Sequence, residues 1–288
     1  MMKKLLLLLL ALFLPLSALA EIHHIADESQ LPEGWQEQEL LRVSFLDMQR
    51  SDAILLQCGG ENMLVDGGLG LHYQRLFNML DERGVTGFKY LWNTHCDGDH
   101  SQGLKIIMNS DRYGTGQLLC PNKITYNDPD DDHEKMVTAS KRHGWEYVQI
   151  SNGDVFTLGG ATITTIRCEE NWGQNNRSAA CFVDFGDSTV FLTGDIGSKV
   201  QKYFVQNVDA ERIRCDILKA PHHGIDGVTE VFVEAVNPGV VVLTNYSDNG
   251  ASKDWNAYNP YMAGDGVVVC ETNGTDWYIW QMPNEVDK

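Results

Sequence analysis

The stretch Asn93-Thr-His-Cys-Asp-Gly-Asp-His100 decides both the fold and the chemistry of this chain. It follows the apolar run 88–92, which is typical of a strand, and precedes residues 101–108, which are typical of a helix. Two histidines and two aspartates therefore crowd one strand-to-helix turn, at the end of a sheet where ligands are usually bound. Imidazole nitrogen and carboxylate oxygen are ligands of hydrolytic metal ions. Because such groups are costly to crowd together without a cation, we interpret this turn as a metal-binding loop.

Other segments of the chain supply matching ligands and carry a resemblance. His95-x-Asp97-x-Asp99-His100 resembles the His-x-His-x-Asp-His motif of the metallo-β-lactamase superfamily, with an aspartate at the second histidine. That variant is similar to the ComEC-like branch, whose hydrolase domain is associated with DNA uptake. Leu192-Thr-Gly-Asp195 resembles the bridging-aspartate motif, and Ile217-Leu-Lys-Ala-Pro-His-His-Gly224 resembles the closing histidine motif.

The opening hairpin of that branch also has a counterpart. Phe45-Leu-Asp-Met-Gln-Arg-Ser-Asp-Ala-Ile-Leu-Leu-Gln57, followed by Met63-Leu-Val-Asp-Gly-Gly68, is similar to it. The resemblance runs in order from about residue 41 to about residue 244. It implies an α/β fold of the metallo-β-lactamase type, an αββα sandwich of two mixed β-sheets with helices on the outer faces. Strands before and after each set of predicted helices favour the same two-sheet arrangement.

The first twenty residues differ in character from the rest of the chain. Lys3 and Lys4 precede an unbroken leucine-rich run, and small residues end it at Ala20, which is typical of a secretory signal peptide over residues 1–20. An uncleaved anchor is the alternative, although the apolar run is short for a membrane span. Residues 21–39 are polar and predict an irregular lead-in. No linker follows, so residues 21–288 are predicted to form one metallo-β-lactamase-like hydrolase domain, exported to the periplasm or secreted, without stable membrane insertion.

The charge of the chain bears on its partners. The formal net charge is −18, and losing Lys3 and Lys4 would change it to −20. Such an acidic chain opposes non-specific binding to nucleic acid, which depends on Lys and Arg at phosphates. It does not exclude a DNA substrate, because bound cations reverse the local field.

Seven cysteines occur in the sequence, an odd number, so at least one is free or pairs between chains. Cys181 and Cys215 are interpreted as buried apolar fillers. Cys96 occupies a spacer position of the metal loop, where it is either a filler or an additional ligand.

The resemblance also implies the metal ligands. By position, His95 and Asp97 hold a first ion, Asp99 and His100 hold a second, and Asp195 bridges both. One histidine of the pair His222 and His223 completes the second site. We favour His223 as this ligand and His222 as the proton donor to a leaving group, although the two roles are interchangeable at this stage. Asp99 also has a possible catalytic role, orienting the attacking hydroxide.

Further residues near these motifs have two interpretations each. Lys219 either binds a substrate oxyanion or caps its strand. Asp66, before two glycines, either orients a histidine through a hydrogen bond or caps a turn. The histidine that many members of the superfamily have in their third motif is absent from this chain. The matching stretch is Asn175-Asn-Arg-Ser178, in which Asn176 or Ser178 is a candidate weak ligand and Arg177 a candidate phosphate contact.

These departures shift the expected metal and pocket. With more oxygen and less nitrogen, the first site favours Mn²⁺ or Mg²⁺, or a single easily lost ion, while Zn²⁺ stays possible. Ile225 stands where the branch usually has a serine, and the late histidine–proline element expected near Asn259-Pro260 lacks its histidine. The pocket is therefore expected to differ from that of the branch more than the metal centre does.

The expected function is that of an exported hydrolase using two divalent metal ions, Zn²⁺ or Mn²⁺ and with Mg²⁺ possible. These ions acidify a bridging water and clamp a phosphodiester substrate, a small molecule or a nucleic acid, as in a nuclease. One alternative is hydrolysis of a lactone, a choline phosphoester or a lactam, the lactam being disfavoured by Asp97. Another is a non-catalytic binding protein that retains the fold within a competence or secretion apparatus.

Overall fold

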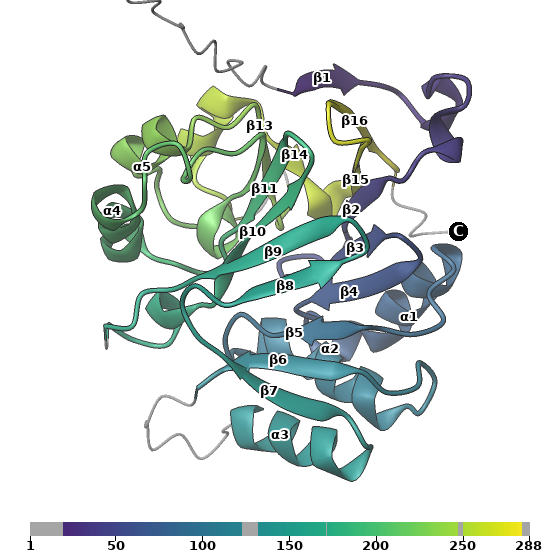
Figure 1. The fold of residues 1–288 in the computed structure, drawn as a ribbon. Helices are drawn as coiled ribbons and strands as arrows, with labels where there is room; N and C mark the ends of the chain where they lie inside the picture. Colours follow the sequence, from purple (N-terminus) through teal and green to yellow (C-terminus); the bar gives the residue numbers. More distant parts are fainter. Residues whose placement is uncertain (1–19, 123–131, 171, 247–249, 284–288) are drawn as a thin grey trace, which may run out of the picture.

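Two β-sheets packed face to face form the centre of the molecule, with helices on both outer sides (Figure 1). The structure is a computed structural model that describes residues 20–122, 132–170, 172–246 and 250–283. The signal peptide predicted over residues 1–20 lies outside the described residues except for Ala20. No helix in these ranges is both long and apolar enough to cross a bilayer.

Among the described residues, the larger sheet has nine strands. In spatial order they are β1 (Glu21–His24), β16 (Asp276–Gln281), β15 (Val268–Thr272), β2 (Leu41–Phe45), β3 (Ile54–Cys58), β4 (Glu61–Val65), β5 (Tyr90–Trp92), β6 (Gln117–Pro121) and β7 (Glu146–Ile150). Strands β2 to β4 form an antiparallel meander, as expected for the opening hairpin, and β4 to β7 run parallel.

The smaller sheet has seven strands in the described part of the chain. In spatial order they are β14 (Tyr261–Met262), β13 (Val240–Leu243), β12 (Ile217–Lys219), β11 (Ser188–Leu192), β10 (Ala180–Phe185), β9 (Ala161–Ile166) and β8 (Val155–Leu158). Strands β11 to β14 run parallel, and β8 to β11 run antiparallel.

Helices connect the parallel strands of each sheet, as parallel pairing requires. The α-helices of the described ranges are α1 (Tyr73–Glu82), α2 (Gly98–Asn109), α3 (Asp132–Arg142), α4 (Ser198–Asn207) and α5 (Glu230–Val236). The first three link β4 to β7 in turn, and α4 and α5 link β11 to β13. The predicted sandwich with outer helices is therefore confirmed.

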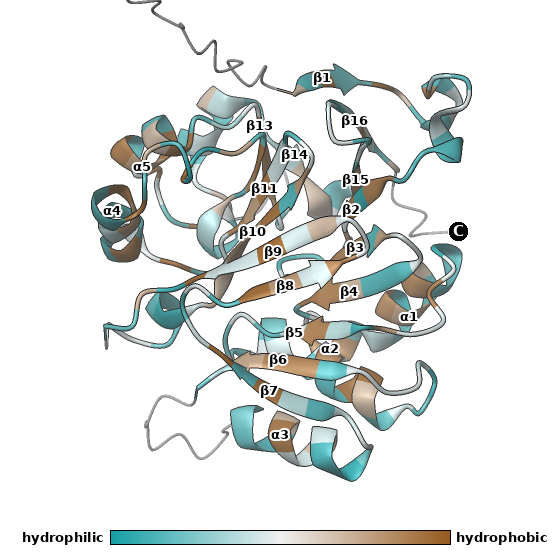
Figure 2. Cartoon of the chain, in the orientation of Figure 1, coloured by the Kyte–Doolittle hydropathy of each residue, from teal (hydrophilic) through white to brown (hydrophobic). Residues whose placement is uncertain are grey.

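Alternating side chains build three apolar layers from these elements. Along β3, Ile54 and Leu56 face the core between the sheets, whereas Leu55 between them packs toward α1 and α2. Along β11, Val190 and Leu192 face the inter-sheet core and Phe191 packs toward α4 and α5. Figure 2 shows the resulting brown colour along β4, β5 and β6. A strand that is apolar on both faces fits only between a sheet and a helix layer.

One expectation for the fold is wrong. The segment predicted as an irregular lead-in contains β1, which pairs in parallel with β16 at the edge of the larger sheet. Its sequence, Glu-Ile-His-His, has no apolar alternation because an edge strand buries little of either face.

Candidate metal centre

Every candidate ligand lies at the carboxyl end of a parallel strand. In the larger sheet, Asp66 follows β4 and the loop with His95 and His100 follows β5. In the smaller sheet, Asp195 follows β11 and the pair beginning at His222 follows β12. Because parallel strands end at the same edge of a sheet, the two sheets bring these loops together at one mouth of the sandwich.

The carboxylate of Asp195 lies at the centre of four imidazoles. Its Oδ2 is 3.2 Å from Nε2 of His100 and 3.3 Å from Nε2 of His223. Nε2 of His222 is 3.7 Å away and Nε2 of His95 is 3.9 Å away. The same ring nitrogen of these four histidines thus faces one oxygen, although two of them follow β5 and two follow β12.

Hydrogen bonds on the opposite ring nitrogens hold two of the imidazoles in this orientation. Nδ1 of His100 lies 2.7 Å from Asp66 Oδ2, a carboxylate that is fully buried. Nδ1 of His223 lies 3.1 Å from Asp52 Oδ1 and 3.1 Å from Thr244 Oγ1. A carboxylate on Nδ1 fixes the tautomer and leaves Nε2 free to ligate a cation. Asp66 therefore makes the histidine contact expected of it.

The donor set fits a metal ion. Nε2 of His95 is buried and has no hydrogen-bond partner within the described ranges. The Nε2 atoms of His100 and His223 face each other at 3.3 Å. Ligand atoms of Asp52, His100, Asp195 and His223 all lie within 4.8 Å of one another. An orphaned imidazole nitrogen beside a buried carboxylate is costly, and a cation there would bind both groups.

The charges of the cluster also favour a bound cation. Burial opposes the charge on His223, but Asp195 and Asp52 outweigh it and raise the pKa of His223 to about 10. Burial likewise opposes ionisation of Asp195, yet His100, His223 and Lys219 hold the pKa of Asp195 well below its usual range. The carboxylates thus favour positive charge on His100 and His223, which is the charge that a divalent ion would supply instead.

Strained backbone places the two adjacent histidines on the same centre. His222 has φ 50° and His223 has φ 53°, both in the left-handed region, between Pro221 and Gly224. Such conformations cost free energy in residues with a Cβ and concentrate at functional sites. Their rings lie 6.0 Å apart, His223 buried and His222 partly exposed with Nδ1 2.9 Å from Asp226 Oδ2.

The loop of the larger sheet depends on a close backbone crossing. Gly67 N donates to His100 O at 2.7 Å, and a Cβ built on Gly103 would lie 1.8 Å from Gly67 O. Only glycine allows this approach of the β4–α1 connection to α2. The crossing sets Asp66 against the first turn of α2, from which His100 projects.

Lys219 has a role different from the expected one. Its ammonium is fully buried, with Nζ 2.5 Å from Asp52 Oδ2, 2.9 Å from Gly194 O and 3.5 Å from Asp195 Oδ1. This position corrects the expected contact with a substrate oxyanion, because the ammonium already has three partners inside the protein. Lys219 positions Asp52 and Asp195 instead. Burial opposes its charge, but Asp52 and Asp195 raise the pKa of Lys219.

The remaining aspartates of the loop line the opening of the centre. Asp97 has a half-exposed side chain whose Oδ2 is 3.4 Å from His95 Nε2, and the imidazole lowers the pKa of Asp97. Gln174 donates to the other oxygen of Asp97. Asp99 Oδ2 lies 3.4 Å from His223 Nε2, so the predicted ligands are brought together within one cluster.

The residues of the third motif hold neighbouring loops of the centre through hydrogen bonds within the protein. Asn176 accepts from Gly197 N and donates to Trp172 O, both at 2.9 Å, so its amide is used within the protein and not at the cluster. Ser178 Oγ accepts from Asp195 N at 3.1 Å and fixes the bridging loop. Arg177 Nη2 donates to Asn122 Oδ1 at 3.2 Å. These contacts correct the expected ligand role of Asn176, and the mostly buried side chain of Arg177 contacts Asn122.

Two residues of the centre were not predicted. Asp52 lies within the segment that resembles the opening hairpin, yet it is buried and contacts Lys219, His223 and Thr244. Thr244 marks the end of β13, a third parallel strand that reaches the same mouth. Their position could have indicated both residues, because each adjoins the end of a strand at the edge of the sandwich that carries the candidate ligands.

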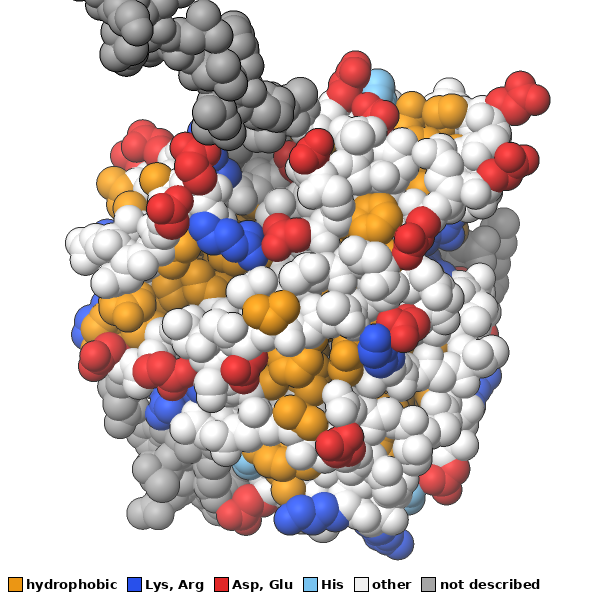
Figure 3. All heavy atoms as spheres, viewed as in Figure 1, with side chains coloured by type: hydrophobic (Ala, Val, Ile, Leu, Met, Phe, Trp, Pro, Cys, Tyr) orange, Lys and Arg blue, Asp and Glu red, His pale blue; other side chains and the backbone are white. Residues whose placement is uncertain are grey.

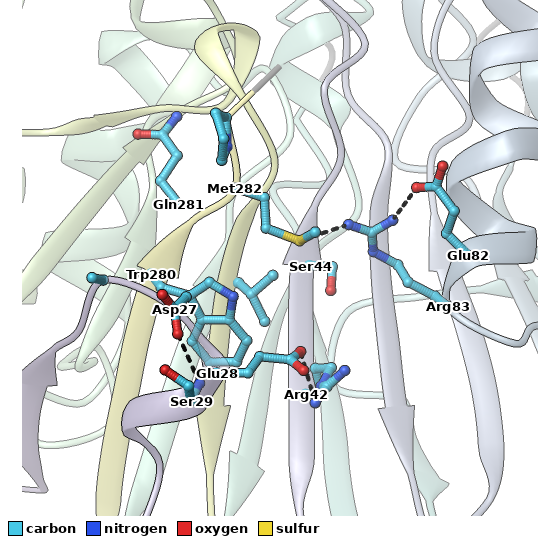
Figure 4. A pocket seen from close by; sticks show the side chains of 13 residues that line it. Asp27, Glu28, Ser29, Arg42, Ser44, Glu82, Arg83, Trp280, Gln281 and Met282 are labelled. Carbon is cyan, nitrogen blue, oxygen red and sulfur yellow. Dashed lines mark hydrogen bonds and ion pairs between the residues drawn. The ribbon is translucent and has the colours of Figure 1, made fainter. Parts of the chain in front are cut away.

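A separate cavity of about 530 Å³ lies at the other end of the larger sheet (Figure 4). It is lined by the start of β2, where Arg42 pairs with Glu271 and Glu28, and by Arg83 beside Glu82. Its two arginines pair with acidic residues and none of its lining residues is a histidine, so it is not the candidate centre.

Comparison with known proteins agrees with this geometry. The sequence profile described as Metallo-beta-lactamase superfamily matches residues 47–243. The chain belongs to this superfamily. The matched residues include the candidate ligands from His95 to His223.

Two relatives in sequence are bacterial proteins. ComE operon protein 3 of Bacillus subtilis is 27% identical over 177 residues, which are 60% of this chain and 22% of that protein. Recombination protein 2 of Haemophilus influenzae is 24% identical over 213 residues, 71% of this chain and 24% of that protein. The chain thus spans about a quarter of the length of these relatives. Both matches confirm the resemblance to the ComEC-like branch of the superfamily.

A solved structure shares the fold. The metallo-beta-lactamase fold protein YhfI of Bacillus subtilis superposes with a TM-score of 0.53 at 13% identity, over 84% of this chain and 99% of that chain. At this identity the likeness shows the fold alone.

Proposed function

We propose that the chain is a metal-dependent hydrolase of phosphodiester bonds, acting at the centre around Asp195. The observation that carries the proposal is the convergence of four imidazole Nε2 atoms, from the segments after β5 and β12, on one oxygen of Asp195 within 3.2–3.9 Å. Membership of the metallo-β-lactamase superfamily supports hydrolytic chemistry at this centre.

Two groups of residues would hold the metal ions. His95 and Asp97 would hold one, Asp99 with His100 and His223 the other, and Asp195 lies between them. Bound divalent ions supply an activated water at neutral pH and neutralise charge on the phosphorus oxygens. The nitrogen–oxygen donor set accepts Zn²⁺ or Mn²⁺, and the half-exposed Asp97 in the first group is suited to ions that prefer oxygen.

Other residues would handle protons and the substrate. His222 is partly exposed, and its Nδ1 bond to Asp226 directs Nε2 toward Asp195, so it is placed to protonate a leaving oxygen. Arg50 lines a cavity of about 190 Å³ with Ser51 and Tyr246, next to the buried Asp52. An exposed guanidinium there would bind a phosphate oxygen.

The surface charge bears on substrate size. Figure 3 shows acidic side chains across one face of the molecule, with basic ones scattered among them and not gathered into a patch. With a net charge of −18, long nucleic acids gain little affinity outside the centre. We therefore expect short phosphodiesters or single-stranded ends to be better substrates than duplex DNA.

We also propose that the protein is exported. The predicted cleavage before Glu21 would leave β1, which begins at that residue, intact at the new amino terminus. Fractionating the cells and sequencing the amino terminus tests this. A mature protein starting at Glu21 in the exported fraction supports export, and an uncleaved chain in the cytoplasm contradicts it.

The hydrolase proposal is tested with bis-p-nitrophenyl phosphate and single-stranded DNA in the presence of Mn²⁺ or Zn²⁺. Asp195→Ala should abolish turnover, whereas His143→Ala, a surface histidine paired with Asp111, should keep it. Turnover that survives Asp195→Ala, or no turnover of any ester tested, would contradict the proposal. Nitrocefin in parallel detects a lactamase instead.

A further inference from the structure

A second cluster of metal-ligating side chains lies behind the metal loop, outside the centre around Asp195. Cys96 comes from the loop after β5, Cys120 from β6 and His133 from the first turn of α3. Their ligand atoms lie within 4.8 Å of one another. Cys120 is fully buried and His133 is 8% exposed. We propose that these residues, with Asn93, form a separate thiolate–imidazole site for a soft divalent ion of the Zn²⁺ type.

The distances match those between ligands of a tetrahedral zinc ion. Bonds of about 2.3 Å to sulfur and about 2.1 Å to nitrogen or oxygen place neighbouring ligand atoms about 3.6 Å apart. Cys120 Sγ lies 3.5 Å from His133 Nδ1. Asn93 Oδ1 lies 3.6 Å from Cys120 Sγ and 3.7 Å from Cys96 Sγ. The Asn93 oxygen therefore occupies the place of a fourth ligand.

The orientation of Asn93 is fixed by its other end. Its Nδ2 donates to Asp66 Oδ1 at 3.2 Å, so its oxygen is turned toward the two sulfurs. Asp66 in turn binds Nδ1 of His100, which links the cysteine cluster to the histidine centre through two side chains. Asn93 is fully buried, as a positioned ligand would be.

Charge and chemistry distinguish this site from the histidine centre. Two thiolates neutralise a divalent ion, so the complex with neutral His133 and Asn93 carries no net charge and is compatible with burial. Thiolates select zinc-like ions over Mn²⁺ or Mg²⁺. The bound ion would tie the ends of β5 and β6 to the start of α3, and its role would be structural, independent of the proposed hydrolase activity.

Cobalt titration of the reduced full-length protein tests this site separately from the histidine centre. Only a thiolate ligand gives a sulfur-to-cobalt charge-transfer band in the near ultraviolet, and the candidate ligands around Asp195 include no cysteine. The intensity of the band at saturation should correspond to one thiolate-bound cobalt per chain, whatever amount of cobalt the histidine centre also binds. Cys120→Ser should reduce it at least tenfold, and His133→Gln should raise the half-saturating cobalt concentration at least tenfold. Cys168→Ser, a matched buried cysteine elsewhere, should leave it unchanged.

A second measurement does not depend on the variants. Zinc should slow alkylation of Cys96 and Cys120 at least tenfold in the unaltered protein, measured on peptides by mass spectrometry. No charge-transfer band in the reduced protein, an undiminished band in Cys120→Ser, or alkylation insensitive to zinc would overturn the proposal. So would a Cys96–Cys120 disulfide in zinc-loaded protein, because bound zinc holds both thiolates.

Discussion

Asp66→Asn tests whether hydrogen bonds behind the histidines set metal affinity. In the wild type the Asp66 carboxylate accepts from His100 Nδ1 at 2.7 Å, from Thr94 N at 2.9 Å and from Thr94 Oγ1 at 2.7 Å. Asparagine keeps the size of the side chain and tolerates the left-handed backbone, φ 57°. Its amide puts either a neutral acceptor or a donor against His100, so the imidazole loses its charged partner.

The expected loss follows from the general cost of removing such a partner, about 10- to 100-fold in metal affinity. This corresponds to about 1.4–2.8 kcal/mol. Competition between the protein and a chromophoric chelator for Zn²⁺ measures it directly. Asp226→Asn is the matched control, because Asp226 binds Nδ1 of the partly exposed His222. An Asp66→Asn protein that remains folded by circular dichroism and binds Zn²⁺ within twofold of the wild type would refute the reasoning.

Three further predictions concern the apoprotein. Lys219→Met should lower the free energy of unfolding by about 3–5 kcal/mol in urea titrations, because the buried carboxylates of Asp52 and Asp195 lose their ammonium partner; an unchanged midpoint would contradict this. The pKa of His223 is raised from 6.5 to about 10, so its stabilising charge is fully present below pH 6.5 and is lost as the pH rises through 10. Melting temperatures should fall over that range in the wild type and less in His223→Gln, and parallel curves would contradict the assignment. Gly103→Ala should cost about 1–3 kcal/mol by thermal unfolding, since its Cβ would lie 1.8 Å from Gly67 O, and wild-type stability would disprove the close crossing.

The sequence predicted the fold well because its strands are apolar on both faces and its ligands follow strand ends. Runs such as Leu55-Leu56 and Val241-Val242 are recognisable without tertiary information, as are the histidine motifs beyond them. The short strand β14 was not predicted, because Tyr261–Met262 is too short for any alternation to appear.

The residues that surround the candidate ligands are harder to predict from the sequence than the clustering of those ligands at strand ends. Asp52 and Lys219 each look like ordinary polar residues in sequence, and only their contact at 2.5 Å across the two sheets explains why both are buried. Asn176 was expected to face a metal ion and instead holds the loop of Gly197. Such roles depend on pairing between distant segments, which local patterns do not encode.

The central claim is that loops from both sheets bind metal ions at Asp195. Anomalous diffraction from crystals grown with Zn²⁺ or Mn²⁺ tests it most directly. We predict a peak within about 2.2 Å of Asp195 Oδ2 and of the Nε2 atoms of His100 and His223. Saturating metal with no anomalous peak among these atoms would contradict the account.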